Sequence, residues 1–162
     1  MQLELLAPTA EDTRSIGEAI ASLLEQGDAI ALTGELGAGK TTLVQGLARG
    51  LGFDGPVLSP TFTLVREYAT GSLPIVHADV YRLDRVQDAV DLGLEETAED
   101  GVLVVEWGDA VETLLPAEHL VVELTVPGEG DERSVRVRSV GAAWNLRWER
   151  LERALDRWGV AA

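Results

Sequence analysis

Cysteine is absent from the 162 residues of this chain, which excludes a disulfide framework, a thiolate metal site and a cysteine nucleophile. Histidine is scarce as well, and two residues of this type argue against a histidine-rich metal centre. The first residues, Met1 to Leu5, lack the basic start and apolar core of a signal peptide. No apolar run approaches the ~20 residues that span a bilayer. We therefore expect a cytoplasmic protein that makes no membrane contact.

Positive charge is also scarce, because lysine and arginine total 13 against 28 aspartates and glutamates, a formal net charge of −15. A chain of this charge repels phosphate backbones and anionic lipid, so tight direct binding to nucleic acid is not expected. Arg133, Arg136 and Arg138 come nearest to a basic patch. They lie in an alternating pattern with Val135 and Val137, and we interpret them as the solvent face of a strand.

The composition is otherwise that of a globular protein, with 46% apolar and 25% charged residues. No repeat, low-complexity tract or linker interrupts the chain, so we predict one domain over residues 1–162. Short apolar runs that predict strands alternate with amphipathic helical segments, and Gly128 to Asp131 predicts a hairpin turn near the end. This order indicates an α/β fold, a P-loop NTPase-like three-layer sandwich whose mostly parallel central sheet is extended by an antiparallel C-terminal hairpin.

The last helical segment carries a stripe of large apolar side chains on one face. The stripe consists of Trp144, Trp148, Leu151, Leu155 and Trp158. Core packing against the sheet is the favoured interpretation, and a partner-binding surface is the alternative.

Residues Gly34 to Thr41 read G-E-L-G-A-G-K-T and fit the phosphate-binding motif G-x-x-x-x-G-K-[ST] without a mismatch. Glycines allow successive backbone N–H groups to turn toward a phosphate, and the following helix directs its positive end at the same anion. Lys40, the only lysine in the chain, would reach the β- and γ-phosphates of ATP, and the Thr41 hydroxyl would ligate Mg²⁺. The expected nucleotide contacts are Glu35, Leu36, Gly37, Ala38, Gly39, Lys40, Thr41 and Thr42.

Hydrolysis requires, in addition, a carboxylate at the end of a neighbouring strand to hold Mg²⁺ or its waters. Glu106 follows four apolar residues and fits this role, whereas Asp79 fits it less well because His77 interrupts the apolar run before it. The catalytic candidates are thus Lys40, Glu106 and Asp79, and the metal ligands Thr41, Glu106 and Asp79.

Four other residues near these motifs leave alternatives open. His77 would orient a neighbouring group or water, or serve the structure alone. Trp107 would cover the nucleotide or fill space, and Arg66 and Arg82 would neutralise transition-state charge or form surface ion pairs.

Five stretches in order resemble the TsaE family, the bacterial ATPases formerly called YjeE that support threonylcarbamoyladenosine formation on tRNA. They are G-E-L-G-A-G-K-T-T-L at 34–43, S-P-T-F at 59–62, H-A-D-V-Y-R-L at 77–83, D-L-G-L-E-E at 91–96 and E-W-G-D at 106–109. The resemblance implies ATP hydrolysis coupled to a complex of TsaD and TsaB, which modifies the adenosine beside the anticodon of tRNAs reading ANN codons. It further implies that Thr61 lies on a switch-like loop with Asp79 and Glu106 near the metal. The relation to tRNA would be indirect, through the complex.

Other functions remain open at this stage. A small-molecule kinase would need an arginine-bearing lid and an acceptor site such as D-x-D, and neither is evident. A GTPase would need the lysine of N-K-x-D, but Lys40 is already the only lysine. A nucleotide-gated binding module with negligible hydrolysis would instead depend on the acidic segment 88–100 and on the tryptophan stripe.

Overall fold

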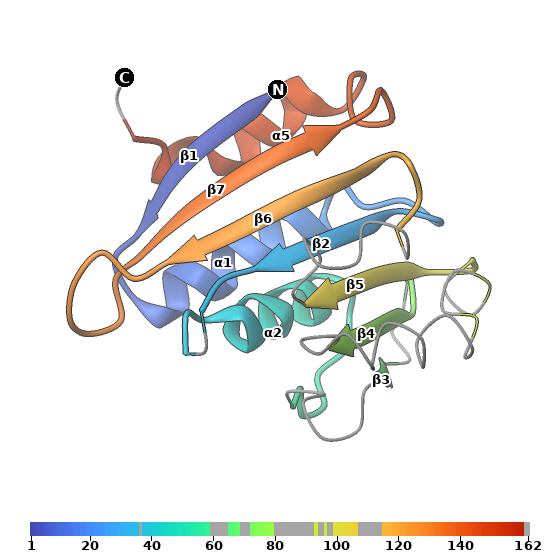
Figure 1. The fold of residues 1–162 in the computed structure, drawn as a ribbon, viewed down its shortest axis with the longest axis horizontal. Helices are drawn as coiled ribbons and strands as arrows, with labels where there is room; N and C mark the ends of the chain where they lie inside the picture. Colours follow the sequence, from blue (N-terminus) through green and yellow to red (C-terminus); the bar gives the residue numbers. More distant parts are fainter. Residues whose placement is uncertain are drawn as a thin grey trace.

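The computed structural model describes residues 1–35, 37–58, 65–68, 72–79, 93, 96, 99–106 and 115–160. Seven strands form one sheet in the order β1-β7-β6-β2-β5-β4-β3 (Figure 1). The strands are β1 (Gln2–Ala7), β2 (Ala29–Thr33), β3 (Val65–Tyr68), β4 (Ile75–Asp79), β5 (Val102–Glu106), β6 (His119–Thr125) and β7 (Arg133–Val140). The helices are α1 (Ala10–Ala21), α2 (Lys40–Gly50), α5 (Trp148–Leu155) and the short 3₁₀ helix η3 (Asp156–Trp158).

The four central strands β6, β2, β5 and β4 are parallel to one another. The outer pairs β6–β7, β7–β1 and β3–β4 are antiparallel. These observations confirm the predicted α/β fold with a parallel centre and an antiparallel C-terminal hairpin. The hairpin does not form the edge of the sheet, because β1 pairs along its outer strand.

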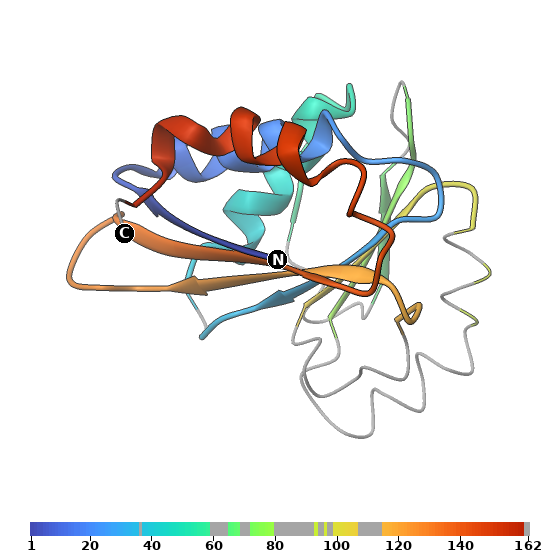
Figure 2. The same ribbon diagram turned by 90° about the horizontal axis from the view of Figure 1, so that it is seen from above.

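Helices α1, α2 and α5 all lie on one face of the sheet (Figure 2). Alternation along each strand sends every second side chain to that face, where Ile30 of β2 and Val104 of β5 join the large core cluster. The intervening residues, such as Ala31 and Val105, belong to a smaller cluster on the opposite face. The parity of a residue in β4 or β5 therefore decides whether its side chain points toward α2.

Helices α1 and α2 pack with their backbones in contact. A Cβ atom added to Gly46 would lie 2.0 Å from the carbonyl oxygen of Arg14, and one added to Gly17 would lie 2.4 Å from that of Leu43. Thr9 caps the start of α1 in a capping box with Asp12. Glycine at positions 17 and 46 thus fixes how closely α1 approaches the helix that follows the phosphate-binding motif.

The tryptophan stripe is part of the core. All five of its side chains are at most 7% exposed, so the core interpretation is confirmed and the surface needed for partner binding is not there. The segment is not one continuous helix, since Trp144 precedes α5 and Trp158 lies in η3. Arg147 anchors it by donating to both carboxylate oxygens of Asp28, at 2.6 and 3.0 Å, and stacks 3.9 Å from the Trp144 ring.

None of the helices in the described ranges is long and apolar enough to cross a membrane. The acidic segment 88–100 lies mostly outside the described residues, and the S-P-T-F stretch at 59–62 with the expected switch-like loop lies entirely outside them.

Candidate functional site

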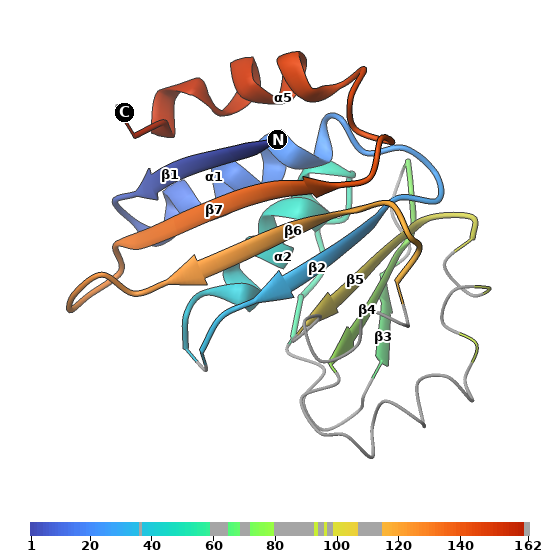
Figure 3. The ribbon, with the colours of Figure 1, turned by 45° about the horizontal axis from the view of Figure 1, so that its top comes forward.

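The carboxyl ends of the four parallel strands meet at one edge of the sheet, as the arrowheads of β6, β2, β5 and β4 show (Figure 3). In open α/β sheets, ligands bind in the crevice outside this edge. The motif 34–41 follows β2 directly, and Asp79 and Glu106 are the last residues of β4 and β5. The fold therefore brings the phosphate-binding motif and both predicted carboxylates to the same edge.

The loop after β2 depends on glycine at three positions. Gly34, Gly37 and Gly39 have φ values of 149°, 83° and 101°, which side-chain-bearing residues rarely adopt. A Cβ at Gly34 would also lie 2.7 Å from the Leu124 carbonyl oxygen. Within the loop the Ala38 N–H donates to the Glu35 carbonyl at 2.9 Å.

Helix α2 begins at the loop without a side-chain cap, since Gly39 occupies the N-cap position. The first N–H groups of a helix have no partner within the helix, so an uncapped end directs donors and a positive dipole at whatever lies before it. Lys40 is the first helical residue, and its Nζ donates to the Gly34 carbonyl at 2.5 Å. Thr41 and Thr42 follow in the same turn and are half-buried.

Asp79 and Glu106 lie side by side on adjacent strands. They are direct partners in the parallel register of β4 and β5, and their residues are 2% and 3% exposed. Both have the parity of Ile75 and Val104, so both point to the face that α2 covers. Glu106 is the nearer to the phosphate-binding loop, because β5 pairs with β2 and sets Glu106 opposite Leu32.

A series of polar contacts links Glu106 through His77 and the Tyr68 hydroxyl to the Leu58 carbonyl. His77 Nε2 lies 2.8 Å from Glu106 Oε2, and neither residue is more than 3% exposed. On the other side of the ring, His77 Nδ1 lies 3.5 Å from the Tyr68 hydroxyl, which donates to the Leu58 carbonyl at 3.1 Å. Burial raises the pKa of the Tyr68 phenol, which keeps it a neutral donor. Of the alternatives for His77, the structure favours orientation of a neighbour, and that neighbour is Glu106.

Arg133 is a site residue that the sequence analysis missed. Its Nε donates to the Ala38 carbonyl at 2.9 Å and its Nη2 to the Gly37 carbonyl at 3.2 Å. The interpretation of Arg133 as part of a solvent face is wrong. It shares its parity with the buried residues Val135 and Val137, whereas Arg136 and Arg138 have the opposite parity and are exposed. That parity is the signal by which the sequence would have revealed it.

A pocket of about 450 Å³ opens between the phosphate-binding loop and the end of β6. Its walls include Gly34, Glu35 and Ala38 on one side and Glu123 and Thr125 on the other. A volume in this range suits a small-molecule ligand.

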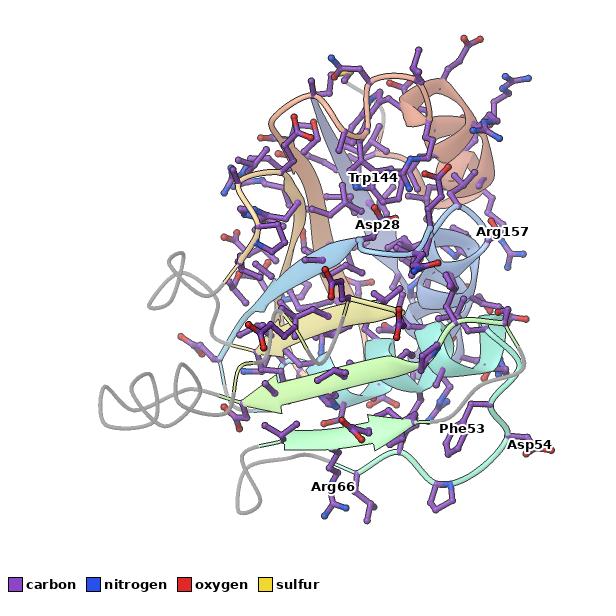
Figure 4. All side chains as sticks on the ribbon, turned by 90° about the vertical axis from the view of Figure 1, so that its right-hand side faces the viewer. Asp28, Phe53, Asp54, Arg66, Trp144 and Arg157 are labelled. Atoms are coloured by element: carbon purple, nitrogen blue, oxygen red, sulfur yellow. The ribbon has the colours of Figure 1, made fainter. Side chains whose placement is uncertain are left out.

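Several predicted residues lie outside the described part of the chain. They are Leu36, Thr61, Arg82 and Trp107. Arg66 is described, and it lies on the edge strand β3 opposite His77 in the register and projects from the sheet (Figure 4). Among the described residues no group of three or more histidine, aspartate or glutamate side chains gathers as a metal site.

The chain is similar to known proteins over most of its length. Residues 7–135 match the family model "Threonylcarbamoyl adenosine biosynthesis protein TsaE". The tRNA threonylcarbamoyladenosine biosynthesis protein TsaE of Bacillus subtilis (strain 168) is 40% identical over 153 residues, which cover 94% of this chain and 95% of the relative. Its counterpart in Streptomyces coelicolor is 44% identical over 137 residues, covering 81% and 93%.

A solved structure also resembles the fold. The crystal structure of YdiB from Bacillus subtilis superimposes with a TM-score of 0.80 at 38% identity, covering 94% of this chain and 95% of that one. The family model, the relatives and the fold match each span most of the chain, and by this agreement the chain belongs to the TsaE family.

Proposed function

We propose that this protein is a Mg²⁺-dependent ATP hydrolase of tRNA threonylcarbamoyladenosine biosynthesis, and that it acts on or resets a complex of TsaD and TsaB. One observation carries the proposal, which is the convergence of the phosphate-binding loop, Asp79 and Glu106 at one edge and on one face of the sheet. Family membership supplies the pathway, because the relatives are named for threonylcarbamoyladenosine biosynthesis.

The phosphates of ATP would bind at the loop and at the start of α2. The left-handed conformations of Gly37 and Gly39, the uncapped helix end and the ammonium group of Lys40 all suit a polyanion. Lys40 Nζ donates to the Gly34 carbonyl at 2.5 Å, a contact that holds its positive charge at the loop. The pocket beside Gly34 and Thr125 has room for the nucleoside end. We also assign Glu35, Leu36, Ala38, Thr41, Thr42 and Thr61 to the nucleotide site.

The residues present fit a magnesium ion. Mg²⁺ prefers oxygen ligands and is commonly bound by one or two carboxylates together with substrate phosphates. Asp79 and Glu106 supply two buried carboxylates in direct register, and Thr41 supplies a hydroxyl in the first turn of α2. When bound, the ion offsets the negative charge of the transferring phosphoryl group. Binding of Mg²⁺ together with the phosphates of ATP needs only one or two protein carboxylates, which Asp79 and Glu106 would supply.

Glu106 is the candidate for orienting the attacking water. A carboxylate does so by accepting a hydrogen bond from the water, which requires a fixed carboxylate orientation. His77 Nε2 lies 2.8 Å from Glu106 Oε2, and in the tautomer that carries its proton on Nε2 the ring would donate to this oxygen and hold that orientation. Because His77 contacts Oε2, the direction of the other carboxylate oxygen, Oε1, is fixed as well, and this oxygen would accept the hydrogen bond from the water. Lys40 would stabilise charge on the phosphate during the transfer.

The acidic charge of the chain supports an indirect relation to tRNA. At a net charge of −15 the protein would repel an RNA backbone. This repulsion does not matter if the partner complex, and not this chain, binds the tRNA. Hydrolysis here would therefore change the state of the partner and leave the transfer chemistry to it.

The test is phosphate release from ATP by the purified protein, alone and after addition of TsaD and TsaB. We expect Lys40→Ala to abolish nucleotide binding with the fold retained, and Glu106→Ala to bind ATP but hydrolyse it at least tenfold more slowly. Wild-type ATPase activity in Lys40→Ala would refute the assignment of the phosphate site. Unchanged turnover in Glu106→Ala would move the catalytic role to another carboxylate.

The same assay separates the alternatives. A small-molecule kinase would transfer phosphate to an acceptor in a metabolite screen, and little of it would be released to water. A binding module with negligible hydrolysis would bind MgATP and the partner complex yet release no phosphate in the presence of both.

A further inference from the structure

We infer that Arg133 is a positioning residue of the phosphate site. By donating hydrogen bonds to the carbonyl groups of Gly37 and Ala38, it sets the orientation of the peptide units in the phosphate-binding loop. The inference rests on the proposed function, because it assigns a role in binding the phosphates of the nucleotide. Arg133 comes from the first position of β7, on the far side of the sheet centre from Asp79 and Glu106.

The contacts of Arg133 are specific to the loop. The guanidinium donates to the Ala38 carbonyl at 2.9 Å and to the Gly37 carbonyl at 3.2 Å. The remaining donors bind Gly130 and Glu132 carbonyls at 2.6 and 2.8 Å, within the turn that precedes β7. The planar fork of arginine thereby joins the hairpin turn to the phosphate-binding loop.

The carbonyl contacts determine where the loop N–H groups point. The Ala38 carbonyl belongs to the same peptide unit as the Gly39 N–H, and the described part of the chain contains no cis peptide. In a trans peptide the C=O and N–H bonds point in opposite directions, so a donor that holds the Ala38 carbonyl turns the Gly39 N–H away from Arg133. A hydrogen bond accepted by the carbonyl also polarises the N–H of the same unit and strengthens it as a donor.

The positive charge of Arg133 also favours an anion at the phosphate-binding loop. No carboxylate of the described residues forms an ion pair with Arg133, although Arg136 and Arg147 each form two. The hydrogen-bond acceptors of Arg133 within the described ranges are carbonyl oxygens, which carry no net charge, so its positive charge stays available to attract an anion. A Cβ added to Gly39 would lie only 3.7 Å from Arg133 Nε, which shows how near this charge is to the loop.

The obvious alternative is that Arg133 merely stabilises the hairpin. Arg138 offers a matched control, because it is an exposed arginine on the same strand without a contact to the loop. Five residues of strand place it about 17 Å away, beyond the Debye length of about 10 Å at 0.1 M salt. Arg133→Gln and Arg138→Gln thus remove the same charge from one strand, and only the first removes the loop contacts.

The experiment measures the affinities of MgADP and of inorganic pyrophosphate by calorimetry, together with thermal unfolding, in the wild type and both variants. We expect Arg133→Gln to weaken both ligands about tenfold, as for loss of charge-assisted contacts, and Arg138→Gln to leave both within twofold. In ATP turnover, Arg133→Gln should raise KM and leave kcat near the wild-type value, the signature of a lost binding interaction.

Equal affinities in Arg133→Gln and Arg138→Gln would overturn the inference while leaving the proposed function intact. If Arg133→Gln does not fold, Arg133→Lys decides, since it keeps the charge but lacks the planar fork that joins the loop carbonyls to those of the hairpin turn. An affinity clearly below the wild type in folded Arg133→Lys supports the inference, and wild-type affinity overturns it. A wild-type protein that binds neither ligand would instead refute the proposed phosphate site itself.

Discussion

The contact between α1 and α2 makes Gly46→Ala a sharp test of how the phosphate site is supported. The added Cβ would lie 2.0 Å from the Arg14 carbonyl oxygen, 2.7 Å from its carbon and 2.9 Å from its Cα. All three are backbone atoms, so no side-chain rotation relieves the overlap. The two helices must separate by roughly 1 Å or more, which opens the close packing on which a core depends.

The magnitude follows from two opposing effects. Overpacking of this kind costs about 3 kcal/mol, at the upper end of its usual range because backbone must move. Alanine in a helix interior recovers about 1 kcal/mol relative to glycine. The expected net loss of stability is about 2 kcal/mol, which lowers the midpoint of thermal unfolding by about 4–8 °C in a domain of this size. Because α2 starts at Lys40, we also expect weaker nucleotide binding.

Thermal unfolding followed by circular dichroism measures the change, and urea denaturation gives the free energy independently. Gly128→Ala is the control, because nothing lies within 4 Å of a Cβ added there. We expect its midpoint to match the wild type within about 1 °C. A Gly46→Ala protein as stable as the wild type would show that the helices do not depend on this close approach.

Three further predictions concern groups buried at or near the core. Arg147→Ala should cost about 3–5 kcal/mol in urea denaturation, because it removes a buried bidentate partner of Asp28; a loss below about 1 kcal/mol would contradict this. Burial raises the pKa of Tyr68 in the folded state only, so the free energy of unfolding should fall as pH rises through about 10, and Tyr68→Phe should flatten that fall. In ATPase assays His77→Gln, which keeps an N–H able to reach Glu106, should retain more activity than His77→Ala, and equal activities would refute the positioning role.

The sequence predicted the parts of this molecule that local rules govern. The phosphate-binding loop is recognisable because its glycines, Lys40 and Thr41 lie within eight consecutive residues. Glu106 was identifiable because it ends an apolar run, and Asp79 less clearly because His77 interrupts the run before it; parallel strands bring such ends to one edge. Their roles in catalysis and metal binding stay predictions.

Other features depend on strand register, which sequence patterns do not specify. The contact between His77 and Glu106 arises from the register of β4 and β5. In this register His77 lies opposite Val104, two residues before Glu106 on the same face of the sheet. Arg133 reaches the loop only because β7 lies next to β6 and β6 next to β2. The close contact at Gly46 requires the packing angle between two helices that are separated in the chain by β2. Each is a long-range relation between residues whose local sequence would suit many partners.

The pairing of β1 with β7 has a consequence for how the protein is made. During synthesis the residues of β1 leave the ribosome well before their hydrogen-bonding partners in β7, and the other five strands of the sheet are made in between. Until then β1 exposes unpaired backbone groups, and the sheet next to β6 stays open. The nascent chain would thus complete its sheet late, and truncated translation products that end before residue 133 should be sensitive to proteases and to chaperone capture.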